Sequence, residues 1–546
     1  MKKLTALLLA LLMIFAFAAC SNPEDPVTPD TPDTEEPNNE AQTPDNEAAD
    51  DKTITVLMAN PPSTLDPHFS SGWCEAAHRY MIWDNLVTYD HNYQIIPSVA
   101  TEWKMIDELN WEFTIRDDVY FSDGEKLTTE DIKYSFDRIE DPNINATGHF
   151  IYCKSGAKIA SVEIIDEHTI HFTTEIPNAE FLMWMKEYPI LPKHYYEANE
   201  LDFLAQNPMG SGPFVCTEFN PTDGCTMVRN EDFWGWGEGL NTTNATKIEW
   251  RYVPEISTRA AELIAGNADI IEKMSMDFKD QLNESGTFLE VASGTRQYIG
   301  IAQNEGANPA LKDVRVRQAL NYAMDVETMC ATMFGGFGER ANSYVAPPNN
   351  SDTPTFTYDP DKAKELLKEA GWEDRDGNGV VENEAGEELR LTMVTTVNYA
   401  TKDKDMAQSV AFYLEEIGIP VILDSVEWSI YAGYRSERDF QHDLFLSTSG
   451  PEFYAAGDLA DLYHDNGANY IHWNSPVYTE LYDELCSSFD QQRKEEIVRE
   501  IDQLMIDEAP IIYMIYPPIY FGLSERVQWE AWGNTAVFLR DVQVVD

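Results

Sequence analysis

Apolar and polar residues alternate along several short stretches of the chain, as they do in half-buried β-strands. Ile54, Val56 and Met58 alternate in "TITVLM", and Trp111, Phe113 and Ile115 alternate in "WEFTI". The stretch "VEIIDEHTIHFTTEIP" predicts another strand. The stretch "SGPFVCTEFNPTDGCTMVRNEDFW" predicts a hairpin that turns at Pro221-Thr222-Asp223-Gly224.

Other stretches repeat their apolar residues at helical spacing. Acidic residues follow Thr128, and Ile132, Phe136 and Ile139 then recur at the period of a helix. Helices are also predicted in "DVRVRQALNYAMDVETMCATMF", "DPDKAKELLKEAGW" and "DMAQSVAFYLEEIGI". The last of these runs into the strand-like "PVILDSVEW", and such a passage from helix to strand is typical of α/β proteins.

The N-terminus is patterned for export rather than for folding. Two lysines precede an apolar run from Leu4 to Ala19, which is shorter than the ~20 residues of a membrane-spanning helix. The run ends in "FAAC", which resembles a bacterial lipobox, so we expect residues 1–20 to be a lipoprotein signal peptide with Cys20 as the lipid anchor. The alternative is an ordinary signal peptide cut near Ala19.

Residues 21–52 carry six prolines and eleven acidic residues, and Val27 is their only large apolar side chain. Such a segment cannot bury enough surface to fold, so we expect a disordered tether that spans roughly 30 Å. The net charge of −57 over 546 residues argues against a nucleic-acid partner, because nucleic-acid affinity rests on basic residues. A chain of this length predicts two or three lobes.

Six cysteines follow Cys20, without metal-ligand spacing. Counting residue pairs outward from the hairpin turn places Cys216 near Arg229 rather than opposite Cys225. A hairpin disulfide is therefore not expected.

An ordered set of motifs resembles the family 5 extracellular solute-binding proteins, the peptide- and nickel-type binding subunits of bacterial ABC importers. The motifs are "STLDPHFSSGWCEAAHRYMIWDNL", "IIPSVATEW", "FTIRDDVYFSDGEKLTTEDIKYSFDRIEDP", "GSGPF", "RNEDFW", "DVRVRQALNYAMD" and "SVEW". The resemblance implies an α/β, bilobal, three-domain periplasmic-binding-protein-like (class II) fold with a hinged ligand cleft. Domain I would comprise residues 53–83, 208–305 and 505–546, domain II residues 84–207, and domain III, the second lobe, residues 306–504.

The resemblance also implies where a ligand lies. In peptide-binding members an extended peptide is held through its backbone as an added strand. One flanking strand would be Ser71, Gly72 and Trp73, and the other Thr448, Ser449 and Gly450. The ligand's ammonium group would pair with Glu452, at a position where the family normally has aspartate. The alternative for Glu452 is a surface acid.

Two more side chains are carried over from the family. Trp428 in "SVEW" would form a flat apolar wall of the cleft, and Arg435 would clamp a carboxylate. The alternatives are a core role for Trp428 and a surface ion pair for Arg435.

Enzyme signatures are absent: the sequence contains no phosphate-binding loop, no H-E-x-x-H and no G-x-S-x-G. The stretch "DRDGNGVVENEA" places Asp374, Asp376 and Asn378 at calcium-ligand positions of an EF-hand loop. The bidentate Glu required at position 12 is replaced by Ala385. A turn without metal and a weak Ca²⁺ site both remain open, and no cofactor is expected.

The sequence thus predicts a monomeric, lipid-anchored receptor on the outer face of the cell membrane. It would deliver oligopeptides or dipeptides to an ABC permease and its ATPase subunits. Two alternatives remain. One is the same fold with an oligosaccharide or another small solute as cargo. The other is an exported hydrolase or a surface adhesion protein.

Overall fold

The structure is a computed structural model. It describes residues 52–69, 73–91, 93–146, 156–237, 239–347, 349–397, 402–437, 440–450, 454–462, 470–532 and 536–545. Residues 51–546 form one compact unit. None of the described helices is both long and apolar enough to cross a membrane.

Three sheets carry most of the strands. In spatial order, the seven-stranded sheet contains β12 (Gly286–Val291), β19 (Ile519–Ser524), β11 (Ile270–Ile271), β1 (Thr53–Met58), β10 (Lys247–Tyr252), β9 (Gly224–Arg229) and β8 (Phe214–Asn220). The six-stranded sheet contains β14 (Glu339–Arg340), β18 (Ile511–Tyr516), β13 (Arg296–Ile301), β17 (Leu444–Ser449), β15 (Leu391–Thr396) and β16 (Val421–Val426). The four-stranded sheet contains β4 (Ala100–Met105), β5 (Asn110–Ile115), β7 (Thr169–Thr174) and β6 (Ile159–Asp166).

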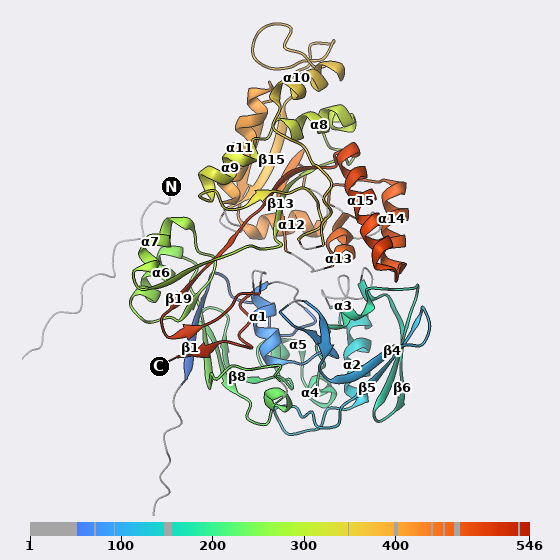
Figure 1. Cartoon of the computed structure of the whole chain (residues 1–546), viewed down its shortest axis with the longest axis vertical. Coiled ribbons are helices and arrows are strands. Elements are labelled where there is room, and N and C mark those ends of the chain that lie inside the picture. Colours follow the sequence, from blue (N-terminus) through green and yellow to red (C-terminus); the bar gives the residue numbers. More distant parts are fainter. Residues whose placement is uncertain are drawn as a thin grey trace, which may run out of the picture. The chain divides into compact units, whose positions relative to one another are not determined.

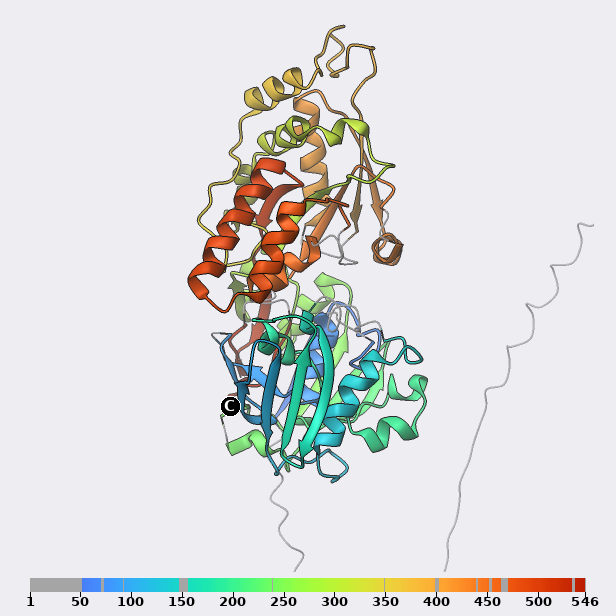
Figure 2. The ribbon, with the colours of Figure 1, turned by 90° about the vertical axis from the view of Figure 1, so that its right-hand side faces the viewer.

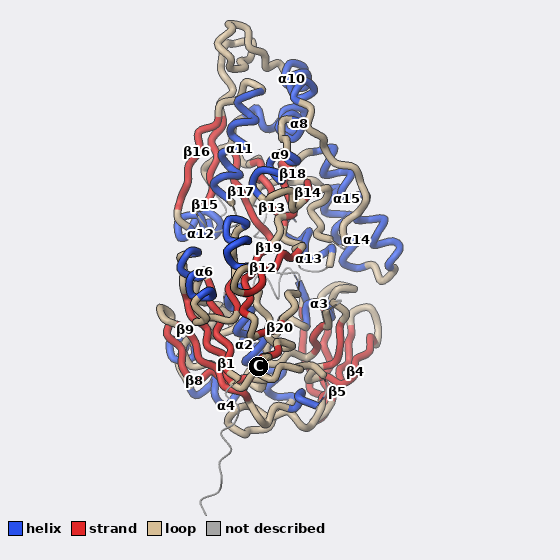
Figure 3. The backbone as a smooth tube through the Cα atoms, turned by 60° about the vertical axis from the view of Figure 1, so that its left-hand side comes forward, coloured by secondary structure: helices blue, strands red, loops and turns tan. Residues whose placement is uncertain are grey.

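Two strand pairs complete the sheets, and helices cover them (Figures 1 and 3). The strand pairs are β2 (Val87–Tyr89) with β3 (Ile95–Pro97), and β20 (Val527–Gln528) with β21 (Gln543–Val544). The helices before β13 are α1 (Trp73–Ile82), α2 (Thr129–Glu140), α3 (Phe181–Met185), α4 (Lys193–Ala198), α5 (Leu201–Leu204), α6 (Ile256–Ile264) and α7 (Lys279–Asn283). Those after it are α8 (Val314–Tyr322), α9 (Val326–Met333), α10 (Pro360–Glu369), α11 (Asp403–Glu416), α12 (Trp428–Glu437), α13 (Ala455–Leu459), α14 (Pro476–Ser487) and α15 (Gln491–Glu508).

The helix predicted after Thr128 is α2, and its local sequence explains both where it starts and which way it faces. The Thr128 backbone N–H donates to the Asp131 carboxylate at 2.9 Å, which closes a capping box. Ile132, Phe136 and Ile139 are buried along one face. The passage from α11 into β16 is also confirmed, because α11 connects β15 to β16 in the chain and the two strands pair in parallel.

The seven-stranded and six-stranded sheets are joined at two places. The chain passes from β12 to β13 through residues 292–295, and from β18 to β19 through Pro517 and Pro518. The Ser293 hydroxyl donates to the Pro517 carbonyl at 2.8 Å, so the two connections lie against each other. Figures 1 and 2 show the long continuous run of β18 and β19. The domain boundaries given above remain a prediction.

The predicted register of the hairpin was wrong. The turn has three residues, because Asn220 pairs with Gly224, and a bulge between Cys216 and Glu218 shifts the ladder again. Cys216 therefore lies opposite Met227. Its Sγ atom lies 3.4 Å from that of Cys225, and both cysteines are free thiols.

Candidate ligand-binding site

A cavity of about 520 Å³ lies where the two connections join the large sheets. Its lining comes from the ends of strands in both sheets, from the connections themselves and from the starts of α6 and α11. The lining residues are Ala59, Pro254, Glu255, Ile256, Arg259, Lys273, Met274, Ser275, Ser293, Thr295, Gln297, Lys402, Asp403, Lys404, Asp405, Thr448, Gly450, Pro517, Pro518 and Ile519. Its volume falls in the range of small-molecule sites.

The strand end predicted at residues 448–450 reaches this cavity. Thr448 and Gly450 line it, whereas the hydroxyl of Ser449 donates to Asp461 at 3.3 Å, away from the lining set. This division follows from the alternation of side chains along β17.

The second edge of β17 lacks a strand partner near the cavity. On one side, β17 pairs with β13 along its whole length, from Leu444 to Ser449. On the other side, β15 pairs only with Leu444 and Phe445. Among the described residues no strand pairs with that edge beyond Phe445, although the Tyr431 hydroxyl donates to the Leu446 carbonyl. Leu446 and Ser447 are buried, but Thr448 and Ser449 are partly exposed, so an extended segment could pair with the main chain at these last two residues of β17.

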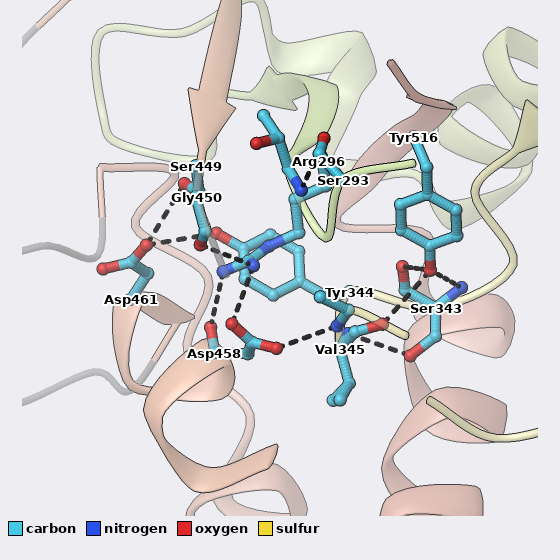
Figure 4. A network of polar contacts seen from close by, with 12 residues as sticks. Ser293, Arg296, Ser343, Tyr344, Val345, Ser449, Gly450, Asp458, Asp461 and Tyr516 are labelled. Carbon is cyan, nitrogen blue, oxygen red and sulfur yellow. Dashed lines mark hydrogen bonds and ion pairs between the residues drawn. The ribbon is translucent and has the colours of Figure 1, made fainter. Parts of the chain in front are cut away.

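A buried ion pair fixes the end of β17 (Figure 4). Arg296, the first residue of β13, donates to the Asp458 carboxylate at 2.9 Å and to the Gly450 carbonyl at 3.1 Å. The other Asp458 oxygen accepts from the Ala346 backbone N–H at 2.8 Å. Both side chains are almost completely buried. Burial is the largest single effect and lowers the pKa of Arg296, but the electrostatic effects of Asp458, Tyr344, Asp461 and Tyr298 together outweigh it and hold the pKa above the ordinary value.

Two further groups extend this network. The Arg296 guanidinium lies over the Tyr344 ring, 4.4 Å from its centroid. Asp461 is half-buried and accepts from the Ser449 hydroxyl and, at 3.5 Å, from the Tyr344 hydroxyl. Figure 4 shows Asp461 beside Ser449, on the side of the network that faces away from Ser343. A carboxylate therefore lies next to the strand end.

Sequence reasoning missed Arg296, Tyr344, Asp458 and Asp461. Arg296 and Asp458 are 162 residues apart, and neither stands in a recognisable motif. The only signal was local: Asp458 and Asp461 follow the segment 448–452 within a few residues, and helix spacing brings them to one side of the chain.

The cavity also holds positive charge. Lys402 and Lys404 come from the start of α11, and both line the cavity. The Lys402 ammonium lies 3.6 Å from Asp405 and 3.7 Å from Asp277. Lys404 is exposed and forms no ion pair with any described residue. An anionic group in the cavity would find Lys404 available.

Arg259 is a different case. Its guanidinium donates to the carbonyls of Val253, Pro254, Glu272 and Lys273, and burial lowers its pKa. The residue therefore ties together the chain around α6, and four of its five N–H donors are engaged.

The other predicted site residues are placed as follows. Trp73 is the first residue of α1, so its assignment to a flanking strand was wrong. Ala77 and Tyr80 are buried at helical spacing, and this core face makes the segment a helix.

Trp428 is half-buried, stacks on Tyr431 at 5.9 Å between ring centroids, and is not among the cavity-lining residues. Its assigned role as a wall of the cleft stays a prediction, as does its core alternative.

Four predictions cannot be placed. Cys20, Ser71, Gly72 and Glu452 lie outside the described residues. Arg435 belongs to α12, but its side chain is outside the described set. The roles assigned to these residues stay predictions.

Comparison with known proteins gives a consistent picture. The sequence profile of the family described as "Bacterial extracellular solute-binding proteins, family 5 Middle" matches residues 94–470. The oligopeptide-binding protein AppA of Bacillus subtilis (strain 168) is 24% identical over 548 residues, which cover 96% of each chain. The nickel-binding periplasmic protein of Escherichia coli (strain K12) is 24% identical over 514 residues, which cover 89% of this chain and 92% of that protein.

A solved structure agrees at the level of the fold. The oligopeptide-binding protein AppA from Bacillus subtilis, in complex with a nonapeptide, superposes with a TM-score of 0.77 at 22% sequence identity. The superposition covers 90% of this chain and 99% of that chain.

Proposed function

The chain belongs to the bacterial extracellular solute-binding proteins of family 5, and from that membership we propose that it captures peptides outside the cell for an ABC importer. The cargo would be an oligopeptide or dipeptide, lying in the cavity beside β17. The chain would carry it to the permease and would itself catalyse no reaction.

The open edge of β17 is the observation that carries this proposal. A peptide backbone that pairs with Thr448 and Ser449 would gain main-chain hydrogen bonds that do not depend on its side chains. The Arg296–Asp458 pair supports such a role, because it holds the Gly450 carbonyl and thus keeps the strand end in place before a ligand arrives.

Charge at the cavity and beside the end of β17 suits the two ends of a peptide. Lys404 is available for the ligand's carboxylate. The ammonium group has two candidate partners: Glu452, from the sequence, and Asp461, which lies next to Ser449. A charge taken out of water needs such a partner.

The oligosaccharide alternative receives less support. Sugar-binding sites stack sugar rings on aromatic side chains, and none of the described residues lining the cavity is aromatic. A metal chelate is a further alternative, since one relative is a nickel-binding protein.

We further propose that Cys20 is lipidated and that residues 21–52 form a tether between the membrane and the compact unit. The support is the sequence pattern of residues 1–52 together with the extracellular location of the family.

A thermal-shift screen tests the cargo. The purified full chain is heated with mixed peptides, with oligosaccharides, and with Ni²⁺ plus histidine. A ligand that binds only the folded state at 100 times its Kd stabilises that state by about 2.7 kcal/mol. We expect peptides to raise the melting temperature. A rise with oligosaccharides or Ni²⁺, and none with peptides, would contradict the proposal.

A further inference from the structure

A cluster of carboxylates lies in the loop between α10 and β15, which extends beyond α10 in Figures 1 and 2. Asp374, Asp376 and Glu382 each place one carboxylate oxygen within 4.8 Å of the others. The cavity described above is lined by other residues, so this cluster is separate from it.

The main chain of this loop is folded tightly around Asp374. The carboxylate of Asp374 accepts from the backbone N–H groups of Gly377 at 2.7 Å and Gly379 at 3.0 Å. Both glycines have positive φ, 80° and 87°, which other residues rarely adopt. The sequence therefore fixes the conformation that brings the carboxylates together.

Glu382 enters the cluster from a buried position. The residue is 7% exposed, and its backbone forms isolated antiparallel β-bridges with Glu373 and Glu388. The neighbouring residue, Val381, is anchored to the lobe by its backbone N–H, which donates to the Gly418 carbonyl at 2.9 Å. Glu382 is therefore held in place by the lobe and not only by the loop.

One oxygen of Glu382 has no partner. Oε1 accepts from the Arg375 backbone N–H at 2.8 Å, but Oε2 is buried and accepts no hydrogen bond. The Arg375 guanidinium does not compensate, because it donates to the carbonyls of Gly371, Glu373 and Glu382. Among the described residues, none of the three carboxylates takes part in an ion pair.

Three carboxylates this close repel one another, and a buried carboxylate oxygen without a partner is costly. A cation among them removes both costs. The donors are hard oxygens, and the spacing of Asp374, Asp376 and Glu382 matches positions 1, 3 and 9 of an EF-hand loop. The residue at position 7, here Val380, contributes its carbonyl in such loops.

We propose that this loop binds one Ca²⁺ ion through Asp374, Asp376 and Glu382. The ion would tie the loop to the lobe through Glu382. Asn378, a candidate third ligand in the sequence, donates from its side chain to Asp376 and Glu388 and accepts from the Val380 N–H. In the proposed set of ligands, Glu382 therefore replaces Asn378. The proposal does not depend on the cargo.

Terbium(III) is a suitable probe, because it occupies oxygen-ligand calcium sites and emits when a nearby indole is excited. Trp372 lies two residues before Asp374. The full chain, freed of metal with EDTA, is titrated with Tb³⁺ and then with Ca²⁺. Physiological ionic strength is used, because the chain's net charge of −57 attracts cations diffusely. We expect sensitised emission that an excess of Ca²⁺ abolishes.

Glu382→Gln should weaken Ca²⁺ binding by at least about tenfold, since even the loss of an outer-shell partner costs about 10–100-fold. Glu387→Gln is the matched control, because Glu387 is exposed in the same loop and, among the described residues, hydrogen-bonds only to Asn383. It should bind as the wild type does. Asp376→Asn serves as the second variant if Glu382→Gln does not fold.

Three results would overturn the proposal. They are the absence of emission that Ca²⁺ displaces, equal affinity in the wild type and in the folded ligand variant, and equal displacement by Mg²⁺.

Discussion

Single residues near the cavity act mainly through buried charge. Arg296 and Asp458 come from distant parts of the sequence and meet in a place that water does not reach. Each neutralises the charge of the other. Arg296 also holds the Gly450 carbonyl at the end of β17, and Asp458 holds the backbone N–H of Ala346. Such a pair adds little to the stability of the fold when compared with apolar residues of similar volume. Removing one partner, however, lowers the stability strongly.

Asp458→Ala should therefore destabilise the protein by about 3–5 kcal/mol, because Arg296 is left buried without its partner. The measurement is the midpoint of urea unfolding. Glu365→Gln is the control, since Glu365 forms an exposed pair with Lys362 and should cost no more than about 1 kcal/mol. Similar midpoints for Asp458→Ala and the wild type would contradict this role.

A second prediction concerns the residue that pairs with the ammonium group of the peptide ligand. Glu452→Gln should weaken binding of peptides with a free N-terminus by about 2–5 kcal/mol, and that of N-acetylated peptides far less. Titration calorimetry with both peptide forms measures this difference. Asp461→Asn is the matched comparison, because Asp461 lies beside the same strand end. If only Asp461→Asn shows the difference, the ammonium partner is Asp461. Equal losses for both peptide forms in Glu452→Gln would remove Glu452 from the role.

At the scale of elements, α15 is joined to the loop that follows β14 through one buried carboxylate. Asp502 accepts from the hydroxyls of Ser343 at 2.7 Å and Ser351 at 2.6 Å. Burial raises the pKa of Asp502 to about 6, although the two serine hydrogen bonds act in the opposite direction. The contact is thus sensitive to pH.

The sign follows from linkage. Between about pH 4 and pH 6 the folded protein keeps the Asp502 proton and the unfolded chain loses it, so this group's contribution to stability falls as pH rises. Asp502→Asn removes the titration. Between pH 4 and pH 7 the wild type should therefore lose about 3 kcal/mol of stability that the variant does not lose, at about 1.4 kcal/mol per pKa unit. Urea midpoints of both proteins across this range measure the difference, and a constant difference would contradict the assignment.

The two cysteines of the hairpin formed by β8 and β9 are predicted to react with an oxidant. The Cys225 thiol hydrogen-bonds to Cys216 and lowers the pKa of Cys216, which favours its thiolate. With oxidised glutathione, Cys216 should form a mixed disulfide and release one glutathione. Cys225 should then displace the second glutathione and leave a Cys216–Cys225 disulfide.

Intact-mass analysis should show the loss of two hydrogens, and peptide mapping should locate the bridge. Cys330 and Cys486 are internal controls, because burial raises their pKa to about 11 and about 12. Glutathione that stays attached to Cys216 would show that the two thiols do not reach bonding geometry.

Local patterns predicted the elements better than they predicted contacts between elements. The start of α2 after Thr128 follows from a few neighbouring residues, and the structure confirms it. The strand at Thr448 and Ser449 was carried over from the family resemblance, and these residues do end β17. The register of Cys216 failed because neither the length of the turn nor the bulge is encoded in simple alternation. The segment at Trp73 was assigned from the family's ligand geometry, although the apolar residues that follow it have helical spacing.

At the scale of the whole molecule, the motif order predicted the family and the α/β fold, and the comparisons confirm both. The cavity could not be predicted from local pattern, because its lining spans residues 59–519 and depends on how two sheets are joined. The paired connections at Ser293 and Pro517 are short, and they are the natural place for a hinge. A ligand that contacts both sides of the cavity would favour a closed arrangement over an open one.

Native mass spectrometry of the protein as purified from its own host tests the central claim most directly. The bound material is released and fragmented, and the emptied protein is then titrated with peptides. We predict adducts that fragment as peptides, and a mass increase of one peptide per chain after titration. Carbohydrate or metal-chelate adducts would contradict the account, as would an empty protein that takes up no peptide.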